Sequence, residues 1–226
     1  MVGAQGQQDT VVVVAGGPGN RPPTLEIPVG PPVVAADSGV DRALALGLHI
    51  EIAVGDFDSV TAAGLEAAHA AGARIERHPP EKDATDLELA LDVAAAFAPQ
   101  RILVLGSDAG RLDHLLSTLL LLGSERFAGC ELDAALGPAV VHVIRGERRL
   151  MGDIGELISL FALHGPAVGV TTEGLRFPLR GETLEPGSSR GVSNVFASSD
   201  ARVTLERGVV LAVRPADHVD DERSTS

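Results

Sequence analysis

The chain has 226 residues, of which 45% are hydrophobic and 22% are charged, and its formal net charge is −13. This composition excludes an acidic disordered chain, and the negative charge argues against broad nucleic-acid binding, which needs a basic face. The single cysteine, Cys130, excludes an internal disulfide framework and zinc sites built from cysteines, and it favours a reducing cytoplasm. No apolar run reaches the ~18 residues of a membrane span, so we expect no membrane contact.

The first part of the chain alternates continuous apolar runs with helical patterns. Such alternation predicts an α/β domain with a mostly parallel, Rossmann-like sheet covered by helices on both faces. The expected strands are residues 11–15, 33–36, 52–54, 74–77 and 102–105. The expected helices are residues 40–46, 61–71, 84–97 and 112–122. We expect this domain to span residues 10–137.

The pattern changes after about residue 137, where helical periodicity largely disappears. Short alternating stretches follow, separated by glycine and proline, at residues 140–144, 156–162, 168–172, 202–205 and 209–213. This pattern predicts a small antiparallel all-β domain over residues 138–216.

Acidic residues follow the predicted strands or open the predicted helices of the first domain. They lie in four segments: Ala36-Asp37-Ser38-Gly39, Gly55-Asp56-Phe57-Asp58-Ser59, Lys82-Asp83-Ala84-Thr85-Asp86 and Gly110-Arg111-Leu112-Asp113-His114. Ligands of open α/β sheets bind beyond the carboxyl ends of the strands, so these segments should share one edge. Asp56 and Asp58 would face the same side of an extended segment and could share a Mg²⁺ ion. Turn formation alone could explain one such segment, but four at one edge favour a metal site.

The segment around Thr85 has a structural explanation beside a functional one. Thr85-Asp86-Leu87-Glu88 is a capping box, which accounts for both polar residues without any ligand. A capped helix N-terminus is also an anion site, and Lys82, the only lysine of the chain, lies just before it.

Two further segments are weaker candidates for phosphate binding. Arg111 offers a planar fork to a phosphate, whereas Asp113 could be an N-cap and His114 a histidine at the edge of the core. Gly16-Gly17-Pro18-Gly19 follows the first strand but fits neither the dinucleotide-binding nor the P-loop pattern.

Taken in order, the four acidic segments resemble those of the thiamine pyrophosphokinase family. The segment Gly187–Asn194, which reads GSSRGVSN, is similar to the Ser-Asn segment of that family, and the resemblance covers nearly all of residues 11–214. The resemblance implies that the hydroxyl of thiamine attacks the β-phosphorus of ATP, giving thiamine diphosphate and AMP. It also implies that the first domain binds ATP and Mg²⁺, while a sandwich-like second domain supplies the thiamine pocket and the contact of a homodimer.

The resemblance implies roles for individual residues by their position. The metal ligands would be Asp37, Asp56, Asp58 and Asp86, and the last three would also be catalytic, with Asp86 as the candidate general base. The nucleotide site would contain Lys82, Asp83, Thr85, Gly110, Arg111, Asp113 and His114. Ser193 and Asn194 would meet the thiamine pyrimidine, with thiamine lying between the acids of one chain and these two residues of its partner.

Two departures from the family pattern leave questions open. Asp37-Ser38-Gly39 stands where members often have Asp-Gly-Gly, and the chain has no tryptophan to stack on thiamine, a role that Phe177 or Phe196 could take. A diphosphokinase of the same fold acting on a pterin alcohol is one alternative, although the Ser-Asn segment favours thiamine. A non-catalytic nucleotide-sensing module is another, although binding alone does not require so many carboxylates near an anion.

Overall fold

The computed structural model describes residues 9–17, 25–107 and 110–215. Pro18 and Gly19 of the glycine-rich loop candidate lie outside the described residues. The chain divides into two compact units between Val143 and Ile144. Within the part of the chain that is described, the helices are too short or too polar to cross a lipid bilayer.

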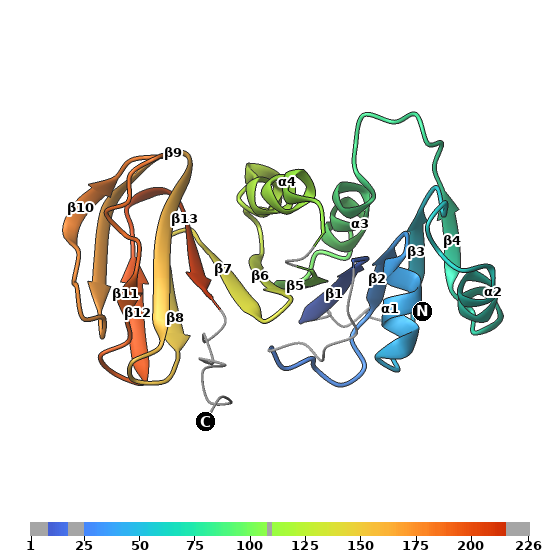
Figure 1. Cartoon of the computed structure of the whole chain (residues 1–226), viewed down its shortest axis with the longest axis horizontal. Coiled ribbons are helices and arrows are strands. Elements are labelled where there is room, and N and C mark those ends of the chain that lie inside the picture. The colour runs from blue at the N-terminus through green and yellow to red at the C-terminus, as the bar shows by residue number, and fades with distance from the viewer. Residues whose placement is uncertain (1–8, 18–24, 108–109, 216–226) are drawn as a thin grey trace, which may run out of the picture. The chain divides into compact units, whose positions relative to one another are not determined.

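A mixed sheet forms the first unit (Figure 1). Its described strands are β1 (Thr10–Ala15), β2 (Val33–Ala36), β3 (Ile52–Gly55), β4 (Arg74–Arg77), β5 (Arg101–Gly106), β6 (Glu131–Leu136) and β7 (Ala139–Ile144). They lie in the order β4-β3-β2-β1-β5-β6-β7, and every neighbouring pair is parallel except β6 and β7. The prediction of parallel strands alternating with helices is confirmed, and β6 adds a strand that the apolar pattern did not reveal.

Helices cover this sheet as the handedness of parallel crossovers requires. The described helices are α1 (Gly39–Ala45), α2 (Ala62–Ala70), α3 (Asp86–Ala95), α4 (Leu112–Leu122) and the short 3₁₀ helix η1 (Glu125–Phe127). The chain moves toward β4 through α1 and α2 and returns through α3 and α4, so these pairs lie on opposite faces (Figure 1). α3 begins two residues later than expected because Thr85 is its N-cap, with Oγ1 accepting from the Glu88 N–H at 3.2 Å.

A polar trio crosses β5, β6 and β7 inside the otherwise apolar sheet. Asp133 is fully buried and accepts from Arg101 Nε at 2.8 Å, while its other oxygen lies 2.7 Å from His142 Nδ1. Each of these three residues belongs to a different strand, so the trio joins neighbouring strands through their side chains.

The second unit consists of strands in its described part. They are β8 (Glu147–Met151), β9 (Leu157–Glu173), β10 (Arg180–Leu184), β11 (Asn194–Val195), β12 (Asp200–Thr204) and β13 (Arg207–Arg214). β9 pairs antiparallel with β10, β11, β12 and β13 and therefore organises the unit. The expected division of residues 156–172 into two strands is wrong, because β13 pairs with both halves of β9 across one register shift.

Candidate functional site

A cavity of about 600 Å³ opens at the carboxyl ends of the parallel strands. The ends of β1, β2 and β5 contribute Gly16, Asp37 and Gly106 to its lining, and the start of α3 contributes Asp86. α4 contributes polar and apolar side chains from several turns, His114 among them. The cavity therefore lies where open α/β sheets bind their ligands, and its volume is within the range of small-molecule sites.

Three of the expected acids gather beside this cavity. Asp37, Asp56 and Asp58 each offer a carboxylate oxygen within 4.8 Å of the others. Gly55 makes room for them, because a Cβ there would lie 3.1 Å from Asp86 Oδ1 and 3.2 Å from Asp37 Cβ. These three acids, predicted to share one edge of the sheet, thus form a compact group of carboxylates.

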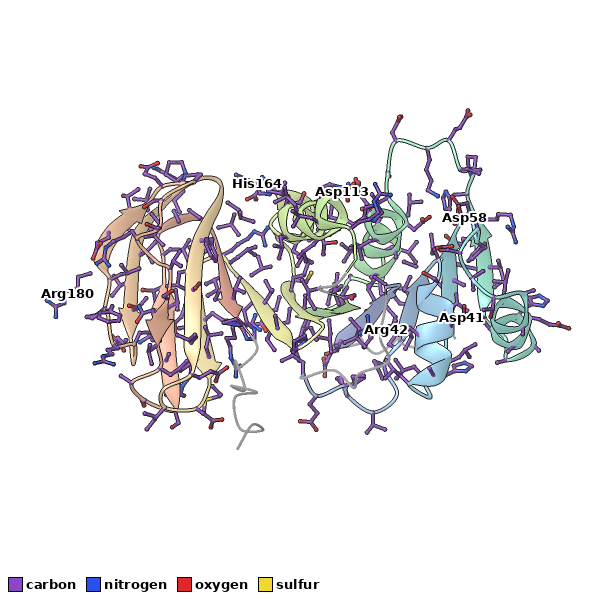
Figure 2. The ribbon with its side chains drawn as sticks, viewed as in Figure 1. Asp41, Arg42, Asp58, Asp113, His164 and Arg180 are labelled. Carbon is purple, nitrogen blue, oxygen red and sulfur yellow. The ribbon has the colours of Figure 1, made fainter. Side chains whose placement is uncertain are left out.

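The Asp56–Asp58 loop turns sharply after β3. Asp56 Oδ1 accepts from the backbone N–H of Asp58 at 3.2 Å, and Phe57 between them has a left-handed φ of 62°. A bulky residue in such a conformation costs about 1–3 kcal/mol, so the surroundings must hold the loop in place. The turn brings both carboxylates to the same side, and Figure 2 shows Asp58 beyond the end of β3.

The two acids of this loop differ in their affinity for protons. The hydrogen bond from the Asp58 N–H lowers the pKa of Asp56, and Lys82 lowers it further against the opposing effect of burial. The negative charge of Asp56 raises the pKa of the exposed Asp58, and Asp37 and Asp86 act in the same direction. Asp58 therefore feels the repulsion of the group, which a bound cation would relieve.

Lys82 joins this group through two carboxylates. Its Nζ lies 2.7 Å from Asp86 Oδ1 and 3.2 Å from Asp56 Oδ2, and its side chain is only 13% exposed. Burial lowers the pKa of Lys82, but its contacts with Asp86 and Asp56 outweigh burial, so the pKa is raised and the ammonium stays charged. Lys82 thus stands beside the acids, where it can also meet an anionic ligand.

The donor set fits a hard divalent cation. Asp37 accepts a hydrogen bond from Ser59 through Oδ2, while its buried Oδ1 has no hydrogen-bond partner in the described part of the chain. A buried carboxylate oxygen without a partner is costly, and a cation at this position would satisfy it. Carboxylate oxygens are the protein ligands that Mg²⁺ prefers, and Mg²⁺ also retains phosphate oxygens and water.

The remaining nucleotide candidates of the first unit differ in how close they lie to the cavity. Thr85, Gly110, Arg111, Asp113 and His114 line it, whereas Asp83 is exposed and is not part of its lining. Arg111 and Asp113 form an ion pair with Nη2 and Oδ2 2.6 Å apart, and both side chains are mostly exposed. This pair stands at the start of α4, where Figure 2 labels Asp113. Exposed pairs of this kind are weak, so Arg111 can exchange its partner for a phosphate.

The Ser-Asn segment of the second unit has a structural role beside its expected role in binding. Asn194 is buried, and its amide is engaged with Phe177: Oδ1 accepts from the Phe177 N–H at 3.0 Å, and Nδ2 donates to the Phe177 carbonyl at 2.7 Å. Oδ1 also accepts from the Val195 N–H at 2.9 Å. The neighbouring Ser193 is exposed and has a left-handed φ of 55°. Asn194 therefore fixes the backbone beneath Phe177, whereas the hydroxyl of Ser193 stands at the surface.

The two candidate aromatic residues have opposite environments. Phe196 is 1% exposed and belongs to the core of the second unit, whereas Phe177 is 53% exposed with the Arg176 guanidinium 5.8 Å from its ring centre. Only an accessible ring can stack on a ligand, so Phe177 is the candidate and Phe196 is a core residue. The sequence alone left the two open.

Both units match models of one enzyme family. Residues 31–132 match the model described as the catalytic domain of thiamin pyrophosphokinase, and residues 141–210 match the one described as its vitamin B1 binding domain. The chain belongs to the thiamine pyrophosphokinase family. The ordered acidic segments and the Ser-Asn segment therefore reflect membership of this family.

Individual members of the family agree with this assignment. The chain is 28% identical over 214 residues to thiamine pyrophosphokinase of Bacillus subtilis (strain 168), covering 92% of this chain and 99% of that protein. The crystal structure of thiamine pyrophosphokinase from Bacillus subtilis superposes with a TM-score of 0.79 at 27% identity, covering 92% of this chain and 99% of that chain. The enzyme from Geobacillus thermodenitrificans gives a TM-score of 0.78 at 27% identity, covering 93% and 99%.

Sequence reasoning missed two residues that shape the acidic group. Ser59 donates to Asp37, and Arg77 Nη1 donates to the backbone carbonyl of Asp56 at 2.9 Å. Ser59 ends the Gly55–Ser59 segment, so its place in the motif was a usable signal. Arg77 carried no signal, since an exposed arginine at the end of an edge strand is ordinary in a sequence.

Proposed function

We propose that this protein is a thiamine pyrophosphokinase, which transfers the diphosphoryl group of ATP to the hydroxyl of thiamine and yields thiamine diphosphate and AMP. The observation that carries the proposal is the group of carboxylates of Asp37, Asp56 and Asp58 beside a cavity in a chain of this family. Diphosphoryl transfer depends on positioning and charge neutralisation more than on covalent catalysis, and this group is suited to both.

Different residues of the first unit would bind the Mg²⁺ ion and the phosphates of the nucleotide. Asp37, Asp56 and Asp58 would hold Mg²⁺ with Asp86 beside them, and the ion, when bound, neutralises and orients the triphosphate. Lys82 and Arg111 donate to phosphate oxygens, the former from within the acidic group and the latter from the rim of the cavity. We assign ATP and Mg²⁺ to the domain of residues 10–137.

Asp86 is the proposed general base. It lies at the first turn of α3 and lines the cavity, and its Oδ1 is paired with Lys82. When Lys82 turns to a phosphate, this oxygen becomes free to accept the proton of the attacking hydroxyl. The oxygen of that hydroxyl then forms the new bond to the β-phosphorus, and the bond from the β-phosphorus to the oxygen of AMP breaks.

We assign the binding of thiamine, which accepts the diphosphoryl group, to the second unit. Phe177 offers an exposed aromatic face for the pyrimidine, and Ser193 an exposed hydroxyl near the Asn194 segment. Asn194 contributes to this site by holding the Phe177 backbone, with which its amide exchanges two hydrogen bonds. We propose that residues 138–216 form a sandwich-like thiamine-binding domain following a Rossmann-like first domain.

The protein is further proposed to be a cytoplasmic homodimer. The family resemblance and the single cysteine support this, and a β domain of roughly 80 residues has limited core of its own. Static light scattering tests the dimer: a mass of one chain across the micromolar range contradicts it.

One product assay tests the proposed reaction. The protein is incubated with ATP, Mg²⁺ and thiamine, and the products are separated by chromatography. AMP and thiamine diphosphate should accumulate in equal amounts. ADP with thiamine monophosphate would mean attack at the γ-phosphorus. If neither thiamine diphosphate nor thiamine monophosphate forms, the protein lacks the proposed activity.

A further inference from the structure

The side chain of Arg77 contacts the backbone and the aromatic ring of the loop that carries Asp56 and Asp58. Arg77 ends β4 and pairs with Gly55, which ends β3 and leads into the loop. Nη1 of Arg77 donates to the carbonyl oxygen of Asp56 at 2.9 Å, and its Cζ lies 5.0 Å from the centre of the Phe57 ring. One guanidinium thus contacts two successive residues of the loop, the backbone of Asp56 and the ring of Phe57.

This loop has two reasons to relax away from its observed conformation. Phe57 has a left-handed backbone, which bulky residues seldom adopt. The carboxylates of Asp56 and Asp58 also lie within 4.8 Å of each other, so their like charges repel. Arg77 opposes both tendencies. Its hydrogen bond to the Asp56 carbonyl fixes the backbone before Phe57, and its guanidinium lies over the buried Phe57 ring.

We propose that Arg77 is a positioning residue that holds the Asp56–Asp58 loop in the conformation that receives a divalent cation, an inference that rests on the proposed function. The guanidinium binds a backbone carbonyl and an aromatic face, so it shapes the loop without occupying a carboxylate. Arg77 does not line the cavity, which separates its role from that of Arg111.

Cation binding to the free protein tests this role directly. Mn²⁺ replaces Mg²⁺ as the probe, and free Mn²⁺ is measured by electron paramagnetic resonance without nucleotide. Arg77→Ala should raise the Mn²⁺ dissociation constant about tenfold, as expected for the loss of one charge-assisted contact. Arg77→Lys should recover part of this loss, because an ammonium can still donate to the Asp56 carbonyl and lie over the Phe57 ring.

Arg74→Ala is the matched control. Arg74 begins the same strand and is paired with Glu76 at 2.5 Å, so its removal deletes the same charge from β4 without touching the loop. The Mn²⁺ dissociation constant of this variant should stay within about twofold of that of the unaltered protein. Thermal unfolding verifies that every variant is folded. If Arg77→Ala does not fold, Arg77→Met, which also lacks a donor and a charge, takes its place with the same expectation.

Activity measurements add a second readout. The Mg²⁺ concentration for half-maximal rate should rise about tenfold in Arg77→Ala. Its kcat at saturating Mg²⁺ should be within about twofold of that of the unaltered protein. Unchanged Mn²⁺ binding, or a kcat that stays low at saturating Mg²⁺, overturns the positioning role. Failure of the unaltered protein to bind Mn²⁺ also overturns it, whereas formation of AMP and thiamine diphosphate would still support the proposed function.

Discussion

Nζ of Lys82 lies 2.7 Å from Oδ1 of Asp86, so the single lysine of the chain neutralises an acid of the candidate site in the free protein. Its second partner, Asp56 at 3.2 Å, belongs to the proposed metal group. Lys82 and a metal ion therefore compete for the same carboxylate charge, and Lys82 has to change partner when a phosphate arrives.

This competition gives Lys82→Met two opposite effects. Without the ammonium, Asp56 and Asp86 bind a cation more readily, so the Mn²⁺ dissociation constant of the free protein should fall about threefold to tenfold. Turnover should fall by about 100-fold or more, because the triphosphate loses a charge partner. Parallel Mn²⁺ titration and steady-state kinetics check both effects, and a simultaneous loss of cation binding would contradict the competition.

Asp56→Asn should abolish most activity while the fold persists. The change keeps the shape of the side chain but removes a charge from the metal group, and Asp56 follows a strand end rather than belonging to the core. We expect kcat to fall by about two to three orders of magnitude, with a midpoint of thermal unfolding close to that of the unaltered protein. Asp92→Asn, on the same domain but paired with Arg126, serves as the control. Near-normal turnover at limiting Mg²⁺ would remove Asp56 from the mechanism.

The same variant should shift the titration of its neighbour. Asp56 raises the pKa of Asp58, so Asp58 takes up a proton at a higher pH than an isolated carboxyl would as the solution is acidified. Removing the Asp56 charge should lower the pKa of Asp58 and move its protonation to lower pH. Carboxyl ¹³C resonances of the metal-free protein measure the midpoint, and an unchanged midpoint would mean that burial, not Asp56, sets it.

Asn194→Ala tests the structural role of that amide. The substitution leaves the N–H groups of Phe177 and Val195 and the Phe177 carbonyl without their partner. The free energy of unfolding should fall by about 2–3 kcal/mol, as for buried polar groups left unpaired, and the KM for thiamine should rise. Ser193→Ala removes the neighbouring exposed hydroxyl and should change stability by less than about 0.5 kcal/mol in urea unfolding. Equal stability of the two variants would exclude the role assigned to Asn194.

Substitution of Phe177 should weaken thiamine binding, whereas substitution of Phe196 should lower the stability of the fold. Phe177→Ala removes a largely exposed ring, so stability should change little while the KM for thiamine rises about tenfold. Phe196→Ala empties a core position and should lower the free energy of unfolding by about 3–5 kcal/mol. Thermal unfolding together with thiamine saturation curves distinguishes the two, and a normal KM in folded Phe177→Ala would exclude stacking on this ring.

The backbone of the first unit could be predicted because its signals are local. Apolar runs marked β1, β2, β3 and β5, and the parallel order placed Asp37 and Asp56 at one edge of the sheet. β6 was not predicted because Asp133 interrupts its apolar pattern, and the partners of that buried acid include Arg101 and His142 from neighbouring strands. Partners that distant in sequence cannot be read from a window of residues.

The second unit and the finer geometry of the site were harder for the same reason. His164-Gly165-Pro166 reads as a turn, yet β9 runs through it because β13 continues to pair beyond the register shift. The contact of Asn194 with Phe177 joins residues 17 positions apart through a loop. Loop conformation also decides that Lys82 meets Asp56, which sequence spacing does not specify.

The polar trio of Arg101, Asp133 and His142 has a consequence for how the β6–β7 hairpin finds its alignment. Asp133 and His142 lie directly opposite each other, and apart from Glu131 at the start of β6 the other residues of the two strands are apolar. Such runs would pair almost equally well if one strand slid along the other. A slip of β7 by one residue, however, sends its side chains to the opposite face and separates His142 from Asp133, which breaks a buried polar pair. The contact between Asp133 and His142 thus favours the native register of the β6–β7 hairpin.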